Sequence, residues 1–477
     1  MPVLRSILTA FVIAGALPLI AGCYQFALAG LHRFRRRAKG ELDHVLNVAV
    51  VVPAWNEAAV IGRTIDTLVA LDYPPERLRV YVVDDASTDE TPDVVRGRAE
   101  QHPGRVVHLR REQGGEGKAH TLNHGLRQIR AEGWYEAVLI IDADVIFTAG
   151  SLPRMVRHLG DPTVGAVTGY IKEGSRPANF INRFIAFEYI SAQAGARRAQ
   201  NVLGAQACLA GGAQLIRRES LEAIGGEIDT SSLAEDTFTT FNVQLAGKRV
   251  IFEPHAIVWA EEPRDMAGLW KQRLRWGRGN VQVTLRYRDT WLRRGRGRLG
   301  GLSFALIWFS VFLMPALLVL SSASLVTLYV LDRQLAFDAF RWFWALNLVT
   351  YVFVTLSAFA YDGPAARRSW WEAITFPGLI SLAIIVVAAS GSLAEKLPDA
   401  WLLFAYVWLS AAMLAAYLVK RLESVRRVGV LARPLLYVVG YGPLLCAITA
   451  AAYLAELRHA EMRWEKTEKT GAVGDLA

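Results

Sequence analysis

Two aspartates separated by one residue follow an apolar run near the middle of the chain. Asp142 and Asp144 come directly after the run AVLII, which extends from Ala137 to Ile141 and is typical of a buried strand. At a strand end both carboxylates can reach the same side of a turn and share a divalent cation. Such a cation would neutralise a departing diphosphate. A D-x-D pattern is common by chance, however, and taken alone it fits a solvated turn better.

A lysine upstream follows a glycine-rich loop. Lys118 comes after Gly114, Gly115 and Gly117 and precedes Asn123. A lysine at such a helix start can place a positive charge near a phosphate. An exposed lysine on a mobile loop explains the pattern equally well, so both interpretations remain open.

A pair of acidic residues opens a helical stretch downstream. Glu235 and Asp236 precede the apolar positions Phe238 to Leu245. A carboxylate there can cap the helix, or it can act as a general base within reach of an acceptor hydroxyl. The position in the chain does not separate these roles.

A second helical stretch carries a guanidinium and an indole on one face. Gln272, Arg275 and Trp276 stand at i, i+3 and i+4. A guanidinium suits phosphate recognition, and an indole offers a flat face to a sugar ring. An amphipathic basic helix on a membrane surface has the same pattern, and one helix can serve both purposes.

Strand-like and helical runs alternate between about residues 45 and 290, which predicts an α/β domain with a mostly parallel sheet. The expected strands are Val48 to Pro53, Val80 to Val83, Val106 to Leu109 and Ala137 to Ile141. Polar residues follow these strands, where open parallel sheets bind ligands, so a nucleotide site is expected there. Neither G-x-G-x-x-G after the first strand nor a Walker A sequence occurs, which argues against a dinucleotide oxidoreductase or a P-loop ATPase.

The composition places part of the chain in lipid. It has 477 residues, of which 53% are hydrophobic, and a formal net charge of +9. The basic residues cluster beside apolar runs, as cytoplasmic flanks of membrane spans do, so nucleic-acid binding is the weaker interpretation. Three cysteines, Cys23, Cys208 and Cys446, form neither a disulfide framework nor a metal-ligand spacing.

Six uncharged stretches are each long enough to cross a bilayer, which needs about 20 residues. They are Ser6 to Leu31, Leu302 to Leu331, Trp342 to Tyr361, Ala373 to Ala394, Ala400 to Val419 and Pro434 to Ala455. If the basic run 32–39 stays inside, the N-terminus is external and alternation leaves the C-terminal tail external as well.

One competing interpretation concerns the N-terminus. Ile20 to Cys23 resembles a lipoprotein processing site after an apolar signal region, and this would send the middle domain outside. The apolar run continues to Leu31 and ends in an arginine-rich cluster that resists translocation, which favours a membrane span.

Taken together, four motifs resemble the family-2 glycosyltransferases of the GT-A fold. They are VVPAWNE (Val51 to Glu57) with VVDDAS (Val82 to Ser87), DAD at 142, ED at 235 and QRLRW at 272. Within that family the chain is similar to the membrane-bound synthases of cellulose, chitin, hyaluronan and, most of all, poly-β-1,6-N-acetylglucosamine.

The resemblance implies a role for each motif. Donor binding falls to Pro53, Trp55, Glu57, Asp85, Lys118, Asp142, Gln272 and Arg275, with uridine at Asp85. Asp142 and Asp144 would hold Mg²⁺ or Mn²⁺, and Asp236 would be the catalytic base. Trp276 and Glu235 would contact the acceptor sugar. Ala86 and Ala234 depart from the usual Gly and Thr at their positions, which puts the donor sugar in doubt but not the enzyme class.

The resemblance also implies an organisation and a function. Residues 1–44 form a membrane segment and basic flank, 45–290 the GT-A domain, 291–457 a membrane region of about five spans, and 458–477 a polar tail. The expected activity is inverting transfer from a UDP-sugar, foremost UDP-N-acetylglucosamine, to a growing β-linked polysaccharide, coupled to its export. The expected place is the bacterial-type inner membrane, with the catalytic domain cytoplasmic.

Two other functions remain open. One is a non-processive enzyme that adds a single sugar to a membrane lipid, since related lipid glucosyltransferases carry similar motifs. The other is a transporter or scaffold that binds nucleotides without catalysis, and it ranks last because the six stretches contain no charged residue for a substrate path. Membrane lipids are expected partners, and a partner protein for export or regulation is left open.

Overall fold

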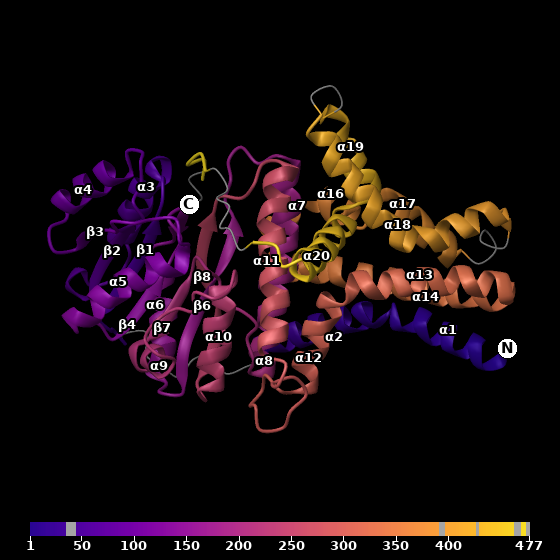
Figure 1. Cartoon of the computed structure of the whole chain (residues 1–477), viewed down its shortest axis with the longest axis horizontal. Coiled ribbons are helices and arrows are strands. Elements are labelled where there is room, and N and C mark those ends of the chain that lie inside the picture. The colour runs from indigo at the N-terminus through magenta and orange to yellow at the C-terminus, as the bar shows by residue number, and fades with distance from the viewer. Residues whose placement is uncertain (35–43, 391–395, 426–428, 462–468, 474–477) are drawn as a thin grey trace.

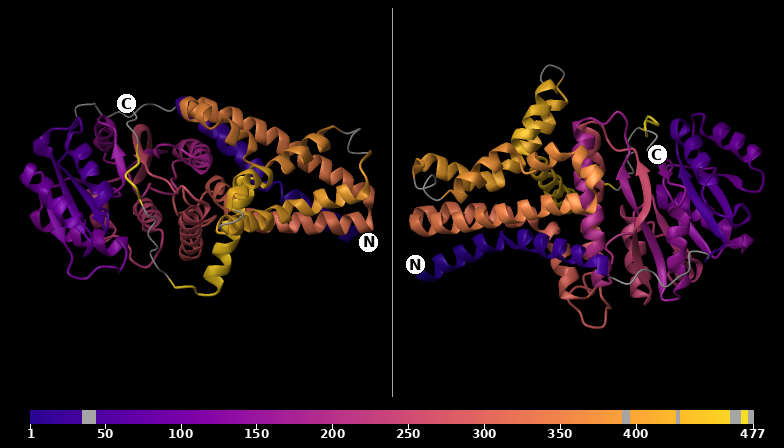
Figure 2. Two further views of the ribbon diagram at one scale, coloured as in Figure 1. Left: turned by 90° about the horizontal axis from the view of Figure 1, so that it is seen from above. Right: turned by 180° about the vertical axis from the view of Figure 1, so that it is seen from behind.

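The protein consists of an α/β body and a bundle of apolar helices that projects from one side of it (Figure 1). The computed structural model describes residues 1–34, 44–390, 396–425, 429–461 and 469–473. The N-terminus lies at the far end of the bundle, away from the α/β body (Figures 1 and 2).

Eight strands form one sheet in the order β3-β2-β1-β4-β7-β6-β8-β5. Strands β1 to β4 are mutually parallel, β7 runs antiparallel to both of its neighbours, β6 and β8 are parallel, and β5 is antiparallel to β8. Their bounds are β1 Val48–Ala54, β2 Leu78–Asp84, β3 Val106–Arg110, β4 Ala137–Ile140, β5 Val145–Phe147, β6 Val164–Glu173, β7 Gln214–Arg217 and β8 Arg249–Ala260. The four predicted strands are confirmed, and the sheet is mixed beyond β4.

Helices cover both faces of the parallel half, which explains why β1 is apolar at every position. Alternate residues of β1 face opposite sides. Val50 packs in one core with Ile65, and Val51 packs in another with Leu126. The helices of the α/β body are α3 Ala58–Val69, η2 Pro75–Arg77, α4 Thr91–Gln101, α5 Lys118–Glu132, α6 Ser151–Val156, η3 Arg157–Gly160, α9 Arg218–Ala223 and α10 Glu235–Leu245.

A layer of helices joins the sheet to the bundle (Figure 1). It consists of α7 (Phe180–Tyr189), the π-helical turn η4 (Ile190–Gly195), α8 (Ala196–Leu203) and the long helix α11 (Met266–Arg286). Helix α11 packs against α20 (Tyr441–Leu457) of the apolar region, and Arg278 forms an ion pair with Glu456 at 2.6 Å. The QRLRW motif lies on α11, so it contacts both halves of the protein.

Four helices in the described part of the chain are long and apolar enough to span a bilayer. They are Pro2–Phe34 (α1 Pro2–Ala14, α2 Leu17–Leu31 and η1 His32–Phe34), α13 Met314–Leu331, α14 Arg333–Tyr361 and α18 Asp399–Glu423. A fifth arises only if the bent pair α19 Gly429–Val439 and α20 is counted as one span. The shorter helices are α12 Leu302–Phe312, α15 Gly363–Arg368, α16 Trp370–Thr375 and α17 Leu379–Ala389.

Helix breaks divide several of the six apolar stretches in the described part of the chain. The stretch Leu302 to Leu331 breaks at Leu313, before Pro315, and only its second part is long enough to cross. The stretch from Ala373 breaks at Gly378, and α17 has only 11 residues; 391–394 lie outside the described residues.

The last expected span, Pro434 to Ala455, bends by 99° at Gly440. Gly440 has φ of +109°, and a Cβ there would lie 2.5 Å from the backbone of Pro377, so only glycine fits. Because the chain turns back here, Lys469 contacts Asp144 inside the α/β body. Segment 469–473 therefore lies on the same side of the helical bundle as the α/β body, whereas alternation over six spans would place the tail on the opposite side.

Candidate active site

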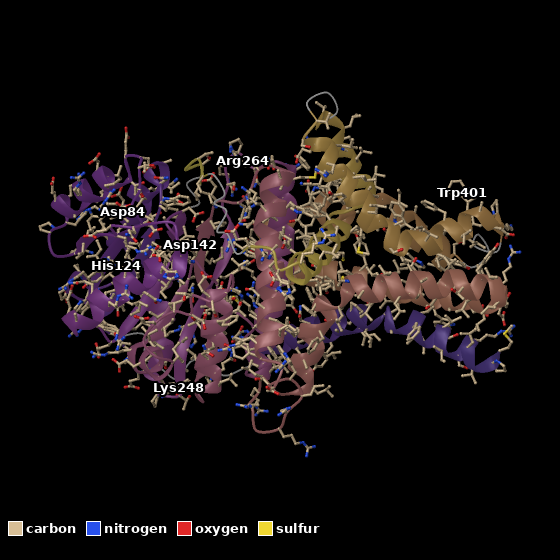
Figure 3. All side chains as sticks on the ribbon, in the orientation of Figure 1. Asp84, His124, Asp142, Lys248, Arg264 and Trp401 are labelled. Atoms are coloured by element: carbon tan, nitrogen blue, oxygen red, sulfur yellow. The ribbon has the colours of Figure 1, made fainter. Side chains whose placement is uncertain are left out.

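A cleft of about 580 Å³ opens where β1, β2 and β4 end, facing α11. All twelve site residues expected from the sequence line it: Pro53, Trp55, Glu57, Asp85, Lys118, Asp142, Asp144, Glu235, Asp236, Gln272, Arg275 and Trp276. Figure 3 labels Asp142 within the outline of the α/β body, and its side chain is partly exposed to the cleft. Motifs spread over more than two hundred residues therefore meet at the carboxyl edge of the parallel strands.

One corner of the cleft is built around Asp85. Its Oδ2 accepts a hydrogen bond from the backbone N–H of Gly115 at 2.9 Å, and its Oδ1 is paired with Arg111. Gly114 touches this corner so closely that a Cβ would lie 2.1 Å from the Asp85 carbonyl oxygen. Ala86, which follows Asp85, has φ of +55°, a left-handed conformation that favours glycine.

Lys118 is at the centre of the cleft. It is buried, and its Nζ lies 2.5 Å from Asp142 Oδ1 and 3.3 Å from Glu235 Oε1. Burial lowers the pKa of the Lys118 ammonium, but Asp142 and Glu235 raise it by more, so the net pKa is above its usual value. Lys118 is therefore a charged group of the cleft, and its interpretation as an exposed lysine on a mobile loop is wrong.

The two carboxylates of the D-x-D motif face different lysines. Burial raises the pKa of Asp142, but the Lys118 ion pair together with Arg275 and Lys469 lowers it overall. Asp144 Oδ2 lies 2.6 Å from the Nζ of Lys469. No group of three or more His, Cys, Asp or Glu side chains that could hold a metal occurs among the described residues. Two carboxylates still fit Mg²⁺ or Mn²⁺, because such ions are often bound by one or two carboxylates plus substrate phosphate oxygens and water.

Asp236 stands in the first turn of α10, close to the other charged groups. Ala234 is the N-cap, and neither Glu235 nor Asp236 caps the helix. The Oδ1 of Asp236 accepts a bond from the backbone N–H of Thr237 at 2.7 Å. A Cβ added to Gly211 would lie 3.3 Å from Lys118 Nζ, 3.4 Å from Asp236 Oδ2 and 3.8 Å from Asp142 Oδ2. Because Gly211 has no side chain, a space remains that is bordered by Lys118, Asp236 and Asp142 together.

Glu235 lies beside Asp236 and is buried. Burial raises the pKa of its carboxyl group, and the opposing charges of Lys118 and Arg275 do not fully offset this.

The QRLRW motif contributes one face of α11 to the cleft. Gln272 donates a hydrogen bond to Glu262 at 3.2 Å, and Arg275 is close enough to lower the pKa values of Asp142 and Glu235. Arg273 turns away and forms a bidentate ion pair with Glu188, with both N–O distances 2.9 Å. Its guanidinium also lies 4.2 Å from the ring centroid of Trp276, which fixes the orientation of the indole.

Several lining or supporting residues were not expected from the sequence. They are Arg111, Glu188, Arg197, Cys208, Glu262 and Lys469. Arg111 follows β3, so its position near β2 could have been suspected once a parallel sheet was expected. No local pattern signals the others, because each depends on a contact between distant parts of the chain.

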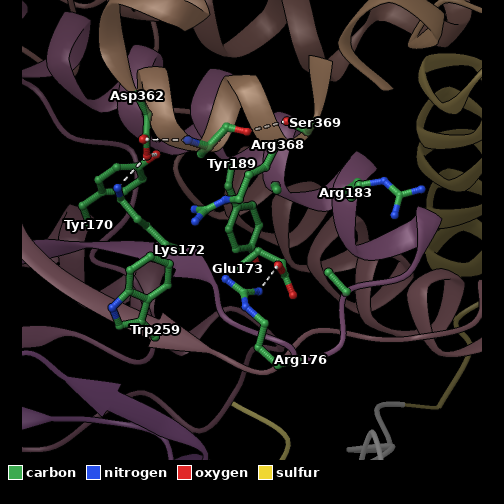
Figure 4. Close-up of a pocket in the computed structure, with 13 residues that line it drawn as sticks. Tyr170, Lys172, Glu173, Arg176, Arg183, Tyr189, Trp259, Asp362, Arg368 and Ser369 are labelled. Carbon is green, nitrogen blue, oxygen red and sulfur yellow. Dashed lines mark hydrogen bonds and ion pairs between the residues drawn. The ribbon is translucent and has the colours of Figure 1, made fainter. Parts of the chain in front are cut away.

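A second cavity of about 210 Å³ lies between the end of β6, α7 and α15 (Figure 4). Lys172 pairs with Asp362 at 2.7 Å, and Arg183 pairs with Glu372 at 2.8 Å. None of the twelve expected residues lines this cavity. Its ion pairs connect the sheet and α7 to the helical bundle. We therefore interpret this cavity as part of the interface between the α/β body and the bundle.

Comparisons with known proteins agree with this geometry. Residues 46–279 match the profile of the family "Glycosyltransferase like family 2". The chain is also 33% identical over 318 residues to the probable glycosyltransferase YdaM of Bacillus subtilis (strain 168), which covers 65% of this chain and 74% of that relative. The chain belongs to family 2 of the glycosyltransferases. The resemblance of its four motifs to this family is therefore confirmed.

Two further proteins are similar to this glycosyltransferase, one in sequence and one in structure. It is 28% identical over 254 residues to the poly-β-1,6-N-acetyl-D-glucosamine synthase of Staphylococcus epidermidis, a match that spans 53% of this chain and 58% of that synthase. The mannosyltransferase PcManGT from Pyrobaculum calidifontis, solved with GDP-Man and Mn²⁺, superposes with a TM-score of 0.55 at 26% identity and covers 82% of this chain and 100% of that one. The GT-A fold expected from the sequence is thus confirmed.

Proposed function

We propose that this glycosyltransferase transfers a sugar from a UDP-sugar, foremost UDP-N-acetylglucosamine, to a growing β-linked polysaccharide, by direct inversion at the anomeric carbon. The observation that carries the proposal is the shared space over Gly211, where Lys118, Asp142 and Asp236 all lie within 4 Å of one added atom. A group that binds diphosphate and a group that removes a proton are therefore close enough to act on one sugar. The match to the staphylococcal synthase supports the polysaccharide product.

In this mechanism Asp236 is the general base. Its carboxylate removes the proton from an acceptor hydroxyl while that oxygen attacks the anomeric carbon, and the bond to the nucleoside diphosphate breaks. Among the described residues Asp236 has no ion pair, unlike Asp142 and Asp144, and its Oδ2 borders the space over Gly211. One carboxylate suffices for a single inversion, and no covalent intermediate is needed.

Donor binding is assigned to the opposite side of the cleft. The corner of Asp85, with Pro53, Trp55 and Glu57 beside it, receives the uridine. Lys118 and Arg275 attract the diphosphate. Asp142 and Asp144 would hold Mg²⁺ or Mn²⁺, which when bound neutralises negative charge on the leaving group. Gln272 orients this side through Glu262.

Acceptor binding is assigned to Trp276 of α11 and Glu235 of α10. The indole of Trp276 lines the cleft and is held by Arg273, so it can present a flat apolar face to a sugar ring. Glu235 would contact an acceptor hydroxyl.

A second candidate is transfer of one sugar to a membrane lipid. Val311 of the apolar helix α12 lines the cleft, so a lipid-linked acceptor could approach from the bundle.

One experiment separates these products. The purified chain in lipid is incubated with Mg²⁺ or Mn²⁺ and radiolabelled UDP-N-acetylglucosamine, other UDP-sugars or GDP-mannose, and the product is sized and its anomeric configuration determined. We expect a long β-linked polymer from UDP-N-acetylglucosamine. A lipid carrying one sugar supports the second candidate, and turnover of GDP-mannose alone contradicts the donor.

A further inference from the structure

Lys469, at the start of the C-terminal segment 469–473, reaches into the cleft although it is far from every other cleft residue in the sequence. Lys469 lines the cleft and pairs with Asp144 at 2.6 Å, and both side chains are largely buried, at 14% and 15% exposure. In Figure 1 the segment is the yellow trace beside the sheet. The second aspartate of the D-x-D motif is therefore neutralised by the chain itself.

The segment is held by a defined set of contacts, which we call its seat and which begins with Glu261. The carboxylate of Glu261 accepts hydrogen bonds from Thr470 N at 3.0 Å, Thr470 Oγ1 at 2.7 Å and Gly471 N at 3.0 Å. Lys469 Nζ also donates to the Glu261 carbonyl oxygen at 2.5 Å. Two consecutive residues thus dock on one acidic side chain at the end of β8.

The far side of the seat is formed by other elements. Val473 is buried and forms a β-bridge with Ser175, and its carbonyl oxygen accepts a bond from Arg63 of α3. Gly471 has φ of +74°, and a Cβ there would lie 2.8 Å from the carbonyl oxygen of Ala59. The seat therefore requires glycine at this position, and the segment connects α3 with the β6 and β8 ends across the cleft.

A divalent cation and the ammonium group of Lys469 would repel each other if both were bound to Asp144. A divalent cation bound to the D-x-D pair would lie about 2.1 Å from a carboxylate oxygen, next to the ammonium of Lys469. Positive charges at that separation repel strongly in a largely buried site. Binding of a metal and diphosphate at Asp144 is thus opposed by the docked segment.

We infer that residues 469–473 are an autoinhibitory segment that competes with the divalent cation and the nucleoside diphosphate for Asp144. In the docked state Lys469 takes the place of the cation, and the cation with its diphosphate displaces the segment when they bind. The inference rests on the proposed function for the identity of these ligands.

Manganese binding tests the competition without any sugar. Electron paramagnetic resonance of the full chain in lipid gives the Mn²⁺ affinity of wild type, Lys469→Ala and Gly471→Ala. We expect about tenfold tighter binding for both variants, within the range of ordinary site-to-site coupling. Gly471→Ala keeps the charge of Lys469 and only disturbs the seat. Lys248→Ala is the matched control, because Lys248 lies at the outer edge of the α/β body (Figure 3) and donates to the Pro162 carbonyl oxygen.

Unchanged affinity in both variants, or absence of Mn²⁺ binding in all of them, overturns the inference. Weaker binding in Lys469→Ala also overturns it, since Lys469 would then complete the site. Because no sugar is present, these outcomes are independent of whether the proposed donor is correct.

Displacement is tested by the accessibility of the segment. In Val473→Cys the new thiol is expected to be protected from maleimide, because Val473 is only 5% exposed. Adding Mn²⁺ with UDP should raise its labelling several-fold above that of the native cysteines in wild type. Labelling that does not rise while Mn²⁺ is bound contradicts displacement.

Discussion

At the scale of single residues, the cleft arranges its charges in two groups. Asp85, Asp142 and Asp144 each have a cationic partner within ion-pair distance. No ion pair of Asp236 is found among the described residues, and its Oδ1 accepts hydrogen bonds from the N–H and Oγ1 of Thr237. Carboxylates that pair with a cation are suited to hold a metal ion or to orient a ligand. This difference separates the proposed donor side from the proposed base.

The role of Asp236 can be tested by a nearly isosteric change. Asp236→Asn keeps an oxygen for the Thr237 N–H but loses the ability to accept a proton. Transfer should fall by at least about 10²-fold, the lower range for general-base catalysis, while UDP binding stays the same. Sugar transfer and UDP affinity are measured on the same preparation. Near-normal transfer would remove Asp236 from the role of base.

Asp144→Asn tests the metal side in the same way. Loss of one carboxylate should weaken Mn²⁺ binding by at least about tenfold and reduce metal-dependent transfer further, because the leaving group is no longer neutralised. The protein should remain in the membrane fraction, since Asp144 has no apolar packing role in the core. Full turnover with Mg²⁺ or Mn²⁺ would mean that the D-x-D motif is only a polar turn.

At the scale of elements, the proposed base and the acceptor face are brought together by a close contact between two helices. Gly279 of α11 faces Ala234, the N-cap of α10, and a Cβ on Gly279 would lie 2.5 Å from the Ala234 Cβ. This position is the one where the family usually has Thr, a larger residue than Ala. The small pair therefore sets the distance between Asp236 on α10 and Trp276 on α11.

Gly279→Ala should separate these helices without removing a polar group. Overpacking of this kind typically costs about 1–3 kcal/mol, and a displacement of about 1 Å near the reacting groups can cost about 10²-fold in rate. We expect kcat to fall by about 10- to 100-fold with unchanged Mn²⁺ affinity. The double variant Ala234→Gly/Gly279→Ala restores the space and should recover most of kcat. Equal losses in the single and double variants would argue against the spacing role.

A control for glycine substitution is available in the same domain. Gly97 lies inside α4 with nothing within 4 Å of an added Cβ. Gly97→Ala should therefore stabilise the protein by about 0.5–1 kcal/mol in thermal unfolding and leave transfer unchanged.

The sequence predicted the parallel half of the sheet better than the rest. Strands β1 and β2 are buried on both faces, so their apolar runs are continuous and easy to find. By contrast, β7 has four residues and contains Gln214 and Arg217, and its antiparallel pairing depends on distant partners. Apolar length also did not reveal the helix breaks at Pro315, Gly378 and Gly440, which interrupt runs whose composition alone fits a membrane helix.

The residues of the candidate site also divide into those that were expected from the sequence and those that were not. Its twelve expected residues belong to short motifs, and the structure brings these motifs together around one cleft, while the roles of the residues stay predictions. Lys469 was missed because only the fold of the whole chain brings the tail to Asp144.

At the scale of the whole molecule, the contact of the tail with the α/β body fixes the relation between the two ends of the chain. The first helices, Pro2–Phe34, are long enough to span a bilayer, and the N-terminus lies at the far end of the bundle (Figures 1 and 2). Cys23 lies within α2, and its Sγ is 3.3 Å from Thr350 Oγ1 of α14. The N-terminus and the C-terminal segment should thus lie on opposite sides of the membrane.

Reporter fusions test this arrangement. A reporter inserted near residue 160 and one fused after residue 477 should both be active only as cytoplasmic reporters, because nucleotide sugars are made in the cytoplasm and the basic run 32–39 favours that side. A reporter placed before residue 1 should be active only on the external side. Alkaline phosphatase activity near residue 160, or lipid labelling of Cys23, would reverse the proposed orientation. An external C-terminal reporter combined with a cytoplasmic domain would instead contradict the docking of Lys469 on Asp144, since one chain end cannot reach a cleft across the membrane.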